Sequence, residues 1–223
     1  VEYLTAGGKN EVTVKITEGA TAKDVDATLA AAGVITPGAL LNFPFKNLAT
    51  QYPFLNQNSL EGFLFPDTYN FALNSSPETV LRRFLDTFEI KAWPLLSSQK
   101  NWYDSLILAS FLEREVKSMN DRQIVAGIIL KRLKLGMPLQ IDATVSYVKC
   151  DQGFMNCAKP GVAKEDLKTD SSYNTYAHLG WTPTPIANPS KGAIQAALTP
   201  QASGYLYYLT DSRSGETVFS KTL

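Results

Sequence analysis

The chain has 223 residues, of which 44% are hydrophobic and 19% are charged, and its formal net charge is zero. This is the composition of an ordinary globular protein, with enough length for one large domain and a small module. Zero net charge excludes bulk attraction to nucleic acid, which is therefore not expected as a partner. No apolar run reaches the roughly 18 residues that span a bilayer, and no signal peptide is visible after Val1.

The first part of the chain has the signals of a strand followed by a helix. In VTVKITEG (12–19), apolar and polar residues alternate, which predicts a half-buried strand. Thr21 with Asp24 three residues later has the pattern of a capping box, and Gly33 is a natural helix stop. These signals predict a small strand–turn–helix module, and the segment 41–59, rich in Asn, Pro and Phe, is interpreted as a connector.

The remaining chain has a mainly helical pattern with strand-like segments at its margins. The aromatic segment LEGFLFPDTYNF (60–71) is typical of a strand until Pro66, and the segments 205–210 and 217–220 predict a β-hairpin around DSRSGE. Helices are predicted from Ser76-Pro77 onward, at 104–117, at 121–136 with Asn120 or Ser118 as its cap, from Asp142 to Tyr147, and after Ser190.

The two cysteines, Cys150 and Cys157, lie seven residues apart in a stretch rich in Gly, Asn and Lys. A C-x6-C spacing without a nearby histidine is a poor metal site. Two interpretations remain: a disulfide that closes a small loop in an oxidising compartment, or two free thiols.

One predicted helix has an apolar surface that is followed directly by two glutamates, Glu113 and Glu115. LASFLEREV (108–116) has no polar face before Glu113, which predicts burial on all sides. Glu113 lies one turn beyond Ala109, so it shares a face with apolar residues. A carboxylate against an apolar wall is poorly solvated, which raises its pKa and keeps it protonated, as a general acid requires. The competing interpretation is a solvated helix end, in which Glu113, Arg114 and Glu115 face water.

Other catalytic patterns are weak in this sequence. His178 is the only histidine, so a serine or cysteine triad would depend entirely on it, and no G-x-S-x-G motif is present. The sequence contains no Gly-rich phosphate loop and no cluster of metal ligands. By elimination the expected chemistry is that of a carboxylate, without a metal or a cofactor.

Five blocks from about Leu60 onward resemble, in order and spacing, the signature blocks of the YceG-like endolytic murein transglycosylases. The blocks are LEGFLFPDTY, LASFLEREV, IILKRLKLGMPLQIDATVSY, YNTYAHLGWTPTPIANPSKGAIQAALTP and YLYYLTDSRSGETVFSKT. The resemblance implies an α+β fold. A small LysM-like strand–helix module with its connector (1–58) would precede a mainly helical catalytic domain (59–223), with marginal strands and a C-terminal hairpin. The match to the module is the looser one.

The resemblance also implies the reaction. Such enzymes cleave the β-1,4 bond between N-acetylmuramic acid and N-acetylglucosamine without water, and leave 1,6-anhydro ends. The substrate supplies the nucleophile, so one carboxyl group acts first as acid and then as base, whereas ordinary glycosidases need two. The block places this group at Glu113, with Glu115 as the second candidate. Glu115 points about 200° round the helix, so both cannot serve one site.

Further positions in the blocks are expected to bind the glycan, because Asn, Gln and Tyr side chains suit sugar hydroxyls and N-acetyl groups. Each has a structural alternative: an edge-strand position for Glu61, turn chemistry for the loop residues 173–176, and helix capping for the neighbouring Asp142. The predicted substrate-binding residues are Glu61, Gln140, Thr144, Tyr173, Asn174, Thr175 and Tyr176.

The expected partners follow from the same resemblance. Glycan strands of peptidoglycan are the substrate and cell-wall synthases are further partners. The implied location is the extracytoplasmic face of the bacterial plasma membrane, reached through a single N-terminal anchor that this sequence does not contain. Two other functions are weighed: a non-catalytic glycan-binding scaffold, and a pyridoxal-phosphate lyase. The second needs a phosphate cup and a lysine in an apolar setting, neither of which the sequence shows.

Overall fold

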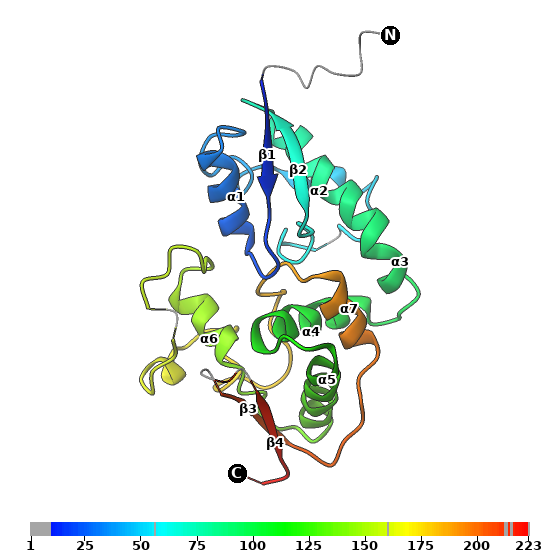
Figure 1. The fold of residues 1–223 in the computed structure, drawn as a ribbon, viewed down its shortest axis with the longest axis vertical. Coiled ribbons are helices and arrows are strands. Elements are labelled where there is room, and N and C mark those ends of the chain that lie inside the picture. Colours follow the sequence, from blue (N-terminus) through cyan, green and yellow to red (C-terminus); the bar gives the residue numbers. More distant parts are fainter. Residues whose placement is uncertain (1–9, 56, 160, 212–213, 215, 223) are drawn as a thin grey trace.

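The structure is a computed structural model that describes residues 10–55, 57–159, 161–211, 214 and 216–222. Helices and two small antiparallel sheets give the α+β fold that the sequence predicts (Figure 1). Residues 1–9 of the predicted module and part of the predicted hairpin turn lie outside the described residues. In chain order the elements are β1 (Glu11–Lys15), α1 (Ala22–Ala31), η1 (Phe45–Leu48), β2 (Thr68–Ala72), α2 (Pro77–Lys91), α3 (Trp93–Leu96), α4 (Trp102–Glu115), α5 (Met119–Lys134), α6 (Asp142–Lys149), η2 (Asp166–Lys168), α7 (Lys191–Leu198), β3 (Tyr207–Thr210) and β4 (Thr217–Ser220).

The N-terminal strand and helix form as predicted. α1 begins with a capping box in which the Thr21 side chain accepts the Asp24 N–H and the Asp24 carboxylate accepts the Thr21 N–H. β1 pairs antiparallel with β2, from Glu11 opposite Ala72 to Lys15 opposite Thr68. This sheet lies between α1 and α2 in Figure 1. It therefore joins segments from both sides of the predicted boundary after residue 58, and that division of the chain stays a prediction.

The segment 60–67 is a buried turn and not a strand, so the prediction of a strand up to Pro66 is wrong. Asn188 Oδ1 accepts the N–H groups of Gly62 and Leu64, both at 2.9 Å, and these donors need no neighbouring strand. Gly62 has φ +92°, and a Cβ there would lie 2.7 Å from Pro185 Cγ. The backbone can make this turn because glycine lacks the Cβ that would clash.

Helix α4 runs through the centre of the lower half of the molecule (Figure 1). All seven residues from Leu106 to Leu112 are buried, which confirms the burial on all sides that the sequence predicts. α7 packs against both α4 and α5. Of the two predicted caps for α5, Ser118 is the one observed, because its side chain accepts the Asp121 N–H. This core holds the C-terminal end of α4, where the two glutamates lie.

The C-terminal strands form the predicted hairpin. β3 pairs antiparallel with β4, and Leu209 lies opposite Val218. Both of these side chains are exposed, whereas Tyr208 and Phe219 pack against the hydrophobic core. The alternation of a strand thus directs Tyr208 toward the helices.

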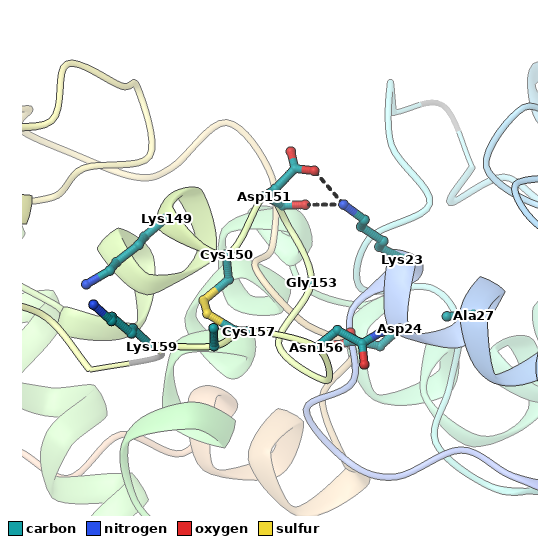
Figure 2. A pocket seen from close by; sticks show the side chains of 11 residues that line it. Lys23, Asp24, Ala27, Lys149, Cys150, Asp151, Gly153, Asn156, Cys157 and Lys159 are labelled. Atoms are coloured by element: carbon teal, nitrogen blue, oxygen red, sulfur yellow. Dashed lines mark hydrogen bonds and ion pairs between the residues drawn. A yellow bond between two sulfur atoms is a disulfide. The ribbon is translucent and has the colours of Figure 1, made fainter.

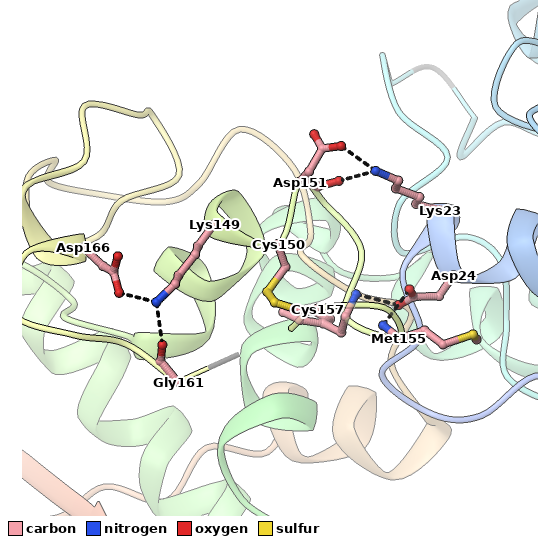
Figure 3. Close-up of a disulfide and its surroundings, with 10 residues drawn as sticks. Lys23, Asp24, Lys149, Cys150, Asp151, Met155, Cys157, Gly161 and Asp166 are labelled. Carbon is pink, nitrogen blue, oxygen red and sulfur yellow. Dashed lines mark hydrogen bonds and ion pairs between the residues drawn. A yellow bond between two sulfur atoms is a disulfide. The ribbon is translucent and has the colours of Figure 1, made fainter. Parts of the chain in front are cut away.

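The two cysteines form a disulfide, which decides between the two interpretations of the sequence. The loop that it closes follows α6 and lies against α1 (Figure 3). The Asp24 carboxylate accepts the N–H groups of Phe154 and Met155, at 3.1 Å and 2.9 Å. The Arg114 guanidinium stacks over the Phe154 ring at 4.0 Å. The disulfide loop therefore connects α6 and α4 to the N-terminal helix.

Candidate active site

The two glutamates at the end of α4 face different parts of the molecule. The Glu113 side chain is only 7% exposed, and its Oε1 accepts Arg122 Nη2 at 2.6 Å. Its Oε2 accepts the backbone N–H of Ser190 at 2.8 Å and the Ser190 hydroxyl at 2.5 Å. The apolar surroundings predicted for Glu113 are therefore wrong. Helical periodicity identified the face of α4, but not the arginine and the serine that pack onto it.

Glu115 has the poor solvation and the raised pKa that the sequence argument expected of Glu113. Its carboxyl group is half-buried, and burial raises its pKa from 4.5 to about 6. The Tyr208 hydroxyl donates to Glu115 Oε2 at 3.0 Å, and the Ala143 N–H at the start of α6 approaches Oε1 at 3.5 Å. Both contacts oppose the effect of burial, while the nearby Asp142 carboxylate adds to it. The result is a carboxyl group that can exchange a proton near neutral pH.

A pocket of about 300 Å³ opens beside Glu115. Two of its walls come from residues that the sequence analysis predicted to bind glycan, Gln140 and Tyr176. Gln140 has φ +54°, a backbone conformation that non-glycine residues rarely adopt and that is often found at functional sites. The lining residues are Glu115, Arg132, Gln140, Asp142, Tyr176, Tyr208, Leu209 and Thr210.

Asp142 belongs to this pocket and does not cap α6, so the capping alternative is wrong. It is the first residue of α6, whose N-cap is Ile141 without a side-chain bond. Asp142 Oδ1 instead accepts the Tyr176 hydroxyl at 2.5 Å. Burial and this carboxylate raise the pKa of the Tyr176 hydroxyl, which therefore stays protonated.

Three of the other predicted residues are fully buried and support the wall of the pocket from behind. Thr175 Oγ1 lies 3.0 Å from Thr144 Oγ1 and accepts the Ile141 N–H at 2.9 Å, while the Gln140 N–H donates to the Thr175 carbonyl at 3.0 Å. Asn174 Nδ2 donates to the carbonyls of Leu167 and Thr169. These bonds shape the loop that carries Tyr176, and the substrate contacts expected for Thr144, Asn174 and Thr175 stay predictions.

Tyr173 and Glu61 lie away from the Glu115 pocket. Tyr173 is half-buried, its ring lies 5.2 Å from that of Tyr147, and its hydroxyl is 2.9 Å from Thr184 Oγ1. Glu61 is buried and does not lie on an edge strand. The Glu61 carboxylate accepts hydrogen bonds from the Ala22 N–H at the start of α1, from the Tyr147 hydroxyl and from the Asn188 side-chain amide. Burial raises its pKa to about 8.

Glu61 lines a separate pocket of about 350 Å³. A larger pocket, of about 510 Å³, lies between α1 and the disulfide loop (Figure 2). Of the residues that line it, Lys23 pairs with Asp151 at 2.5 Å, and Lys149 pairs at 2.5 Å with Asp166, which is not a lining residue. None of the predicted site residues lines it. We place the candidate active site at Glu115 because a half-buried acid and predicted glycan-binding residues meet there.

Four residues that line the pocket were not predicted from the sequence: Arg132, Tyr208, Leu209 and Thr210. Arg132 is buried in α5, where it donates to the carbonyls of Leu139 and Leu206 and stacks over the Tyr207 ring at 4.9 Å. The alternation along YLYYLT could have indicated that Tyr208 and Tyr207 point to opposite faces of β3. No local pattern shows that the inward face meets Glu115.

Two further findings concern the described part of the chain only. It contains no group of three or more His, Cys, Asp or Glu residues arranged to hold a metal ion. None of its helices combines the length and apolar character needed to cross a membrane.

Comparison with known proteins identifies the class of the chain. The model of the YceG-like family matches residues 1–223, so the chain belongs to the YceG-like family. A crystal structure of a YceG-like protein from Listeria monocytogenes superposes with a TM-score of 0.82 at 30% identity, and covers 95% of this chain and 73% of that one.

Two relatives have a named activity. The endolytic murein transglycosylase of Bacillus subtilis (strain 168) is 36% identical over 178 residues, which are 75% of this chain and 46% of the relative. The endolytic murein transglycosylase of Streptococcus pneumoniae serotype 2 (strain D39 / NCTC 7466) is 29% identical over 188 residues, which are 82% of this chain and 33% of the relative. The chain therefore spans less than half the length of these relatives.

Proposed function

We propose that the chain is an endolytic peptidoglycan transglycosylase. It cleaves the β-1,4 bond between N-acetylmuramic acid and N-acetylglucosamine within glycan strands and leaves 1,6-anhydro ends. The observation that carries the proposal is the carboxyl group of Glu115, which lines a pocket and has its pKa raised to about 6. Membership of a family whose relatives bear this name supports it.

The proposed reaction needs one carboxyl group in two protonation states. Protonated Glu115 gives its proton to the glycosidic oxygen as the bond from C1 to that oxygen breaks. The resulting carboxylate then takes the proton of the muramyl 6-hydroxyl as O6 bonds to C1, which closes the anhydro ring and restores the acid. No water is consumed, so no second carboxylate is needed to activate one.

The geometry favours Glu115 over Glu113 for this role. The sequence argument assigned the role to Glu113, but Arg122 and Ser190 occupy both oxygens of that carboxylate. Breaking a largely buried carboxylate–guanidinium pair is costly, so the Glu113 carboxylate is not readily available to a substrate. Glu115, the second candidate of the sequence analysis, has an open pocket on one side.

The walls of the same pocket suit a saccharide. Gln140 and Tyr176 offer an amide and a hydroxyl beside Glu115, and Leu209 adds an apolar surface. The proposed contacts are with sugar hydroxyls and N-acetyl groups of the glycan strand. The strand–helix module before residue 58 is proposed as the LysM-like part of the same protein.

The proposal includes the location and the partners. The substrate lies outside the cytoplasm, where the disulfide between Cys150 and Cys157 is stable, because such bonds persist in oxidising compartments. We place the protein at the outer face of the plasma membrane, held by an N-terminal anchor beyond the present sequence, with cell-wall synthases as neighbours.

The experiment is digestion of purified peptidoglycan, followed by mass spectrometry of anhydromuropeptides. Glu115→Gln should lower the yield by at least about 10²–10⁴-fold, because an amide cannot transfer the proton. Glu113→Gln should keep the specific activity of the folded fraction. Normal turnover of Glu115→Gln with an inactive Glu113→Gln would restore the assignment to Glu113. If the wild-type protein binds strands but releases no anhydro ends, a glycan-binding scaffold is the better description.

A further inference from the structure

One hydrogen-bond donor in the candidate site has no role in the reaction described above. The Tyr208 hydroxyl donates to Glu115 Oε2 at 3.0 Å, although β3 lies 93 residues after Glu115 in the sequence. We propose that Tyr208 is a positioning residue, whose hydroxyl fixes the orientation of the Glu115 carboxyl group and stabilises its ionised form. The inference rests on the proposed function of Glu115.

The groups around Glu115 act on its charge in opposite directions. Burial and the Asp142 carboxylate favour the protonated form, whereas Tyr208, the Ala143 N–H and the Arg114 guanidinium favour the ionised form. Tyr176 reaches Asp142 from the facing loop. From α5, Arg132 also lines the pocket, and its guanidinium donates to backbone carbonyls and to Gln140 Oε1. Tyr208 is thus the side-chain donor that bonds directly to the Glu115 carboxyl group.

A carboxyl group that serves as acid and then as base needs such a balance. Burial alone would favour the acid and hinder the second step, in which the carboxylate must exist long enough to accept a proton. A donor on Oε2 stabilises that carboxylate and leaves Oε1 for the transfer. Within the described part of the chain, Oε1 has only the long contact of 3.5 Å with the Ala143 N–H.

Tyr208 can serve as a permanent donor because it does not itself titrate near neutral pH. Burial and the adjacent Glu115 raise the pKa of its hydroxyl well above the ordinary value of 10. The proton therefore stays on the phenol in both steps. This excludes Tyr208 as the acid of the reaction and leaves it the role of orienting and stabilising Glu115.

The hairpin also provides a matched control. Tyr207 is the adjacent residue of β3, and its ring stacks with the Arg132 guanidinium at 4.9 Å. Tyr207→Phe and Tyr208→Phe each remove one hydroxyl and keep the ring. Only Tyr208→Phe removes a hydrogen bond to Glu115.

The test is a titration of Glu115 in the full chain without substrate, by carbon NMR with ¹³C-labelled glutamate. Glu115→Gln identifies the signal. In Tyr208→Phe the pKa of Glu115 should rise by about one pH unit, the size expected for loss of a hydrogen bond to a charged group. In Tyr207→Phe it should stay unchanged. Incorporation of 3-fluorotyrosine at position 208 makes the phenol a stronger donor and should lower the pKa.

The pH profile of anhydromuropeptide release provides the second measurement. Its alkaline limb should move to higher pH in Tyr208→Phe and to lower pH with 3-fluorotyrosine, while the melting temperatures stay close to that of the wild type. Equal Glu115 titrations in the wild type, Tyr208→Phe and the fluorinated protein would overturn the inference. If the titrations shift while Glu115→Gln stays active, the positioning role holds and the proposed function of Glu115 fails.

Discussion

The end of α4 presents two glutamates only two residues apart, and their surroundings differ in kind. Glu113 meets a guanidinium, a hydroxyl and a backbone amide, all within 2.8 Å. Glu115 meets a phenol, a more distant amide and an open pocket. Both residues are partly buried, so burial alone does not decide their roles. The difference between the two glutamates therefore lies in their bonding partners. Glu113 is held in an ion pair, whereas the Glu115 carboxyl group borders an open pocket.

The largest effect on stability is expected from removal of the Glu113 carboxylate. Glu113→Ala should lower the free energy of unfolding by about 3 kcal/mol, because it leaves the partly buried Arg122 guanidinium without its carboxylate. Glu115→Ala should cost far less. Urea unfolding of both variants measures the difference. Equal decreases in the free energy of unfolding would contradict the stabilising role of the Glu113–Arg122 ion pair.

A second prediction separates residues that line the pocket from those behind it. Asn174→Ala should destabilise the protein by about 3 kcal/mol, because the carbonyls of Leu167 and Thr169 lose their donor and the Tyr176 N–H loses its acceptor, three hydrogen bonds in all. Specific activity of the folded fraction should persist. Tyr176→Phe should show the reverse, with weaker activity and an unchanged melting temperature. Thermal melts beside the digestion assay distinguish the two patterns.

Removal of the disulfide tests whether the surroundings of Glu113 and Glu115 both depend on the disulfide loop. Replacing Cys150 and Cys157 by Ser should cost about 2.5 kcal/mol, the chain-entropy value for a loop of this length. Activity per folded molecule should not change, because neither cysteine lines the Glu115 pocket. Lys23→Ala serves as the control, since its exposed ion pair with Asp151 contributes little. A selective loss of activity in the double variant would show that the loop is coupled to the site.

The smallest effect concerns the pH dependence of stability. The folded-state pKa of Glu115 is raised from 4.5 to about 6, so the folded protein binds the proton more tightly than the unfolded chain does. This contribution is fully favourable below pH 4.5 and is lost as the pH rises through 6. At pH 8, Glu115→Gln should therefore be more stable than the wild type by about 1 kcal/mol, allowing for partial exposure. At pH 4 the gain should vanish, which denaturant titrations at both values can measure.

Local signals in the sequence predicted much of the fold. The caps at Thr21, Ser76, Ser118 and Ser190 mark helix starts that the structure confirms, because each side chain satisfies a backbone donor close in the chain. The segment 60–67 failed as a strand because Asn188, more than a hundred residues away, satisfies its donors. Aromatic content indicated burial there, but not the type of backbone.

The candidate site was predicted only in part, because it too depends on contacts between segments far apart in the chain. The blocks led to Gln140 and Tyr176, which do line the pocket with Glu115. The choice between Glu113 and Glu115 depends on Arg122, Ser190 and Tyr208, which come from three other segments of the chain. Helical periodicity gives the direction of each glutamate but carries no information on what packs against that direction.

The position of Tyr208 in the chain has a consequence for biosynthesis. The donor to Glu115 comes from β3, which follows α7 and is translated after every helix of the fold. A ribosome-bound chain that has emerged only as far as α7 contains Glu115, Gln140 and Tyr176, but lacks the strand that completes the pocket. The pocket beside Glu115 would thus be completed only after the helices that support it have been made.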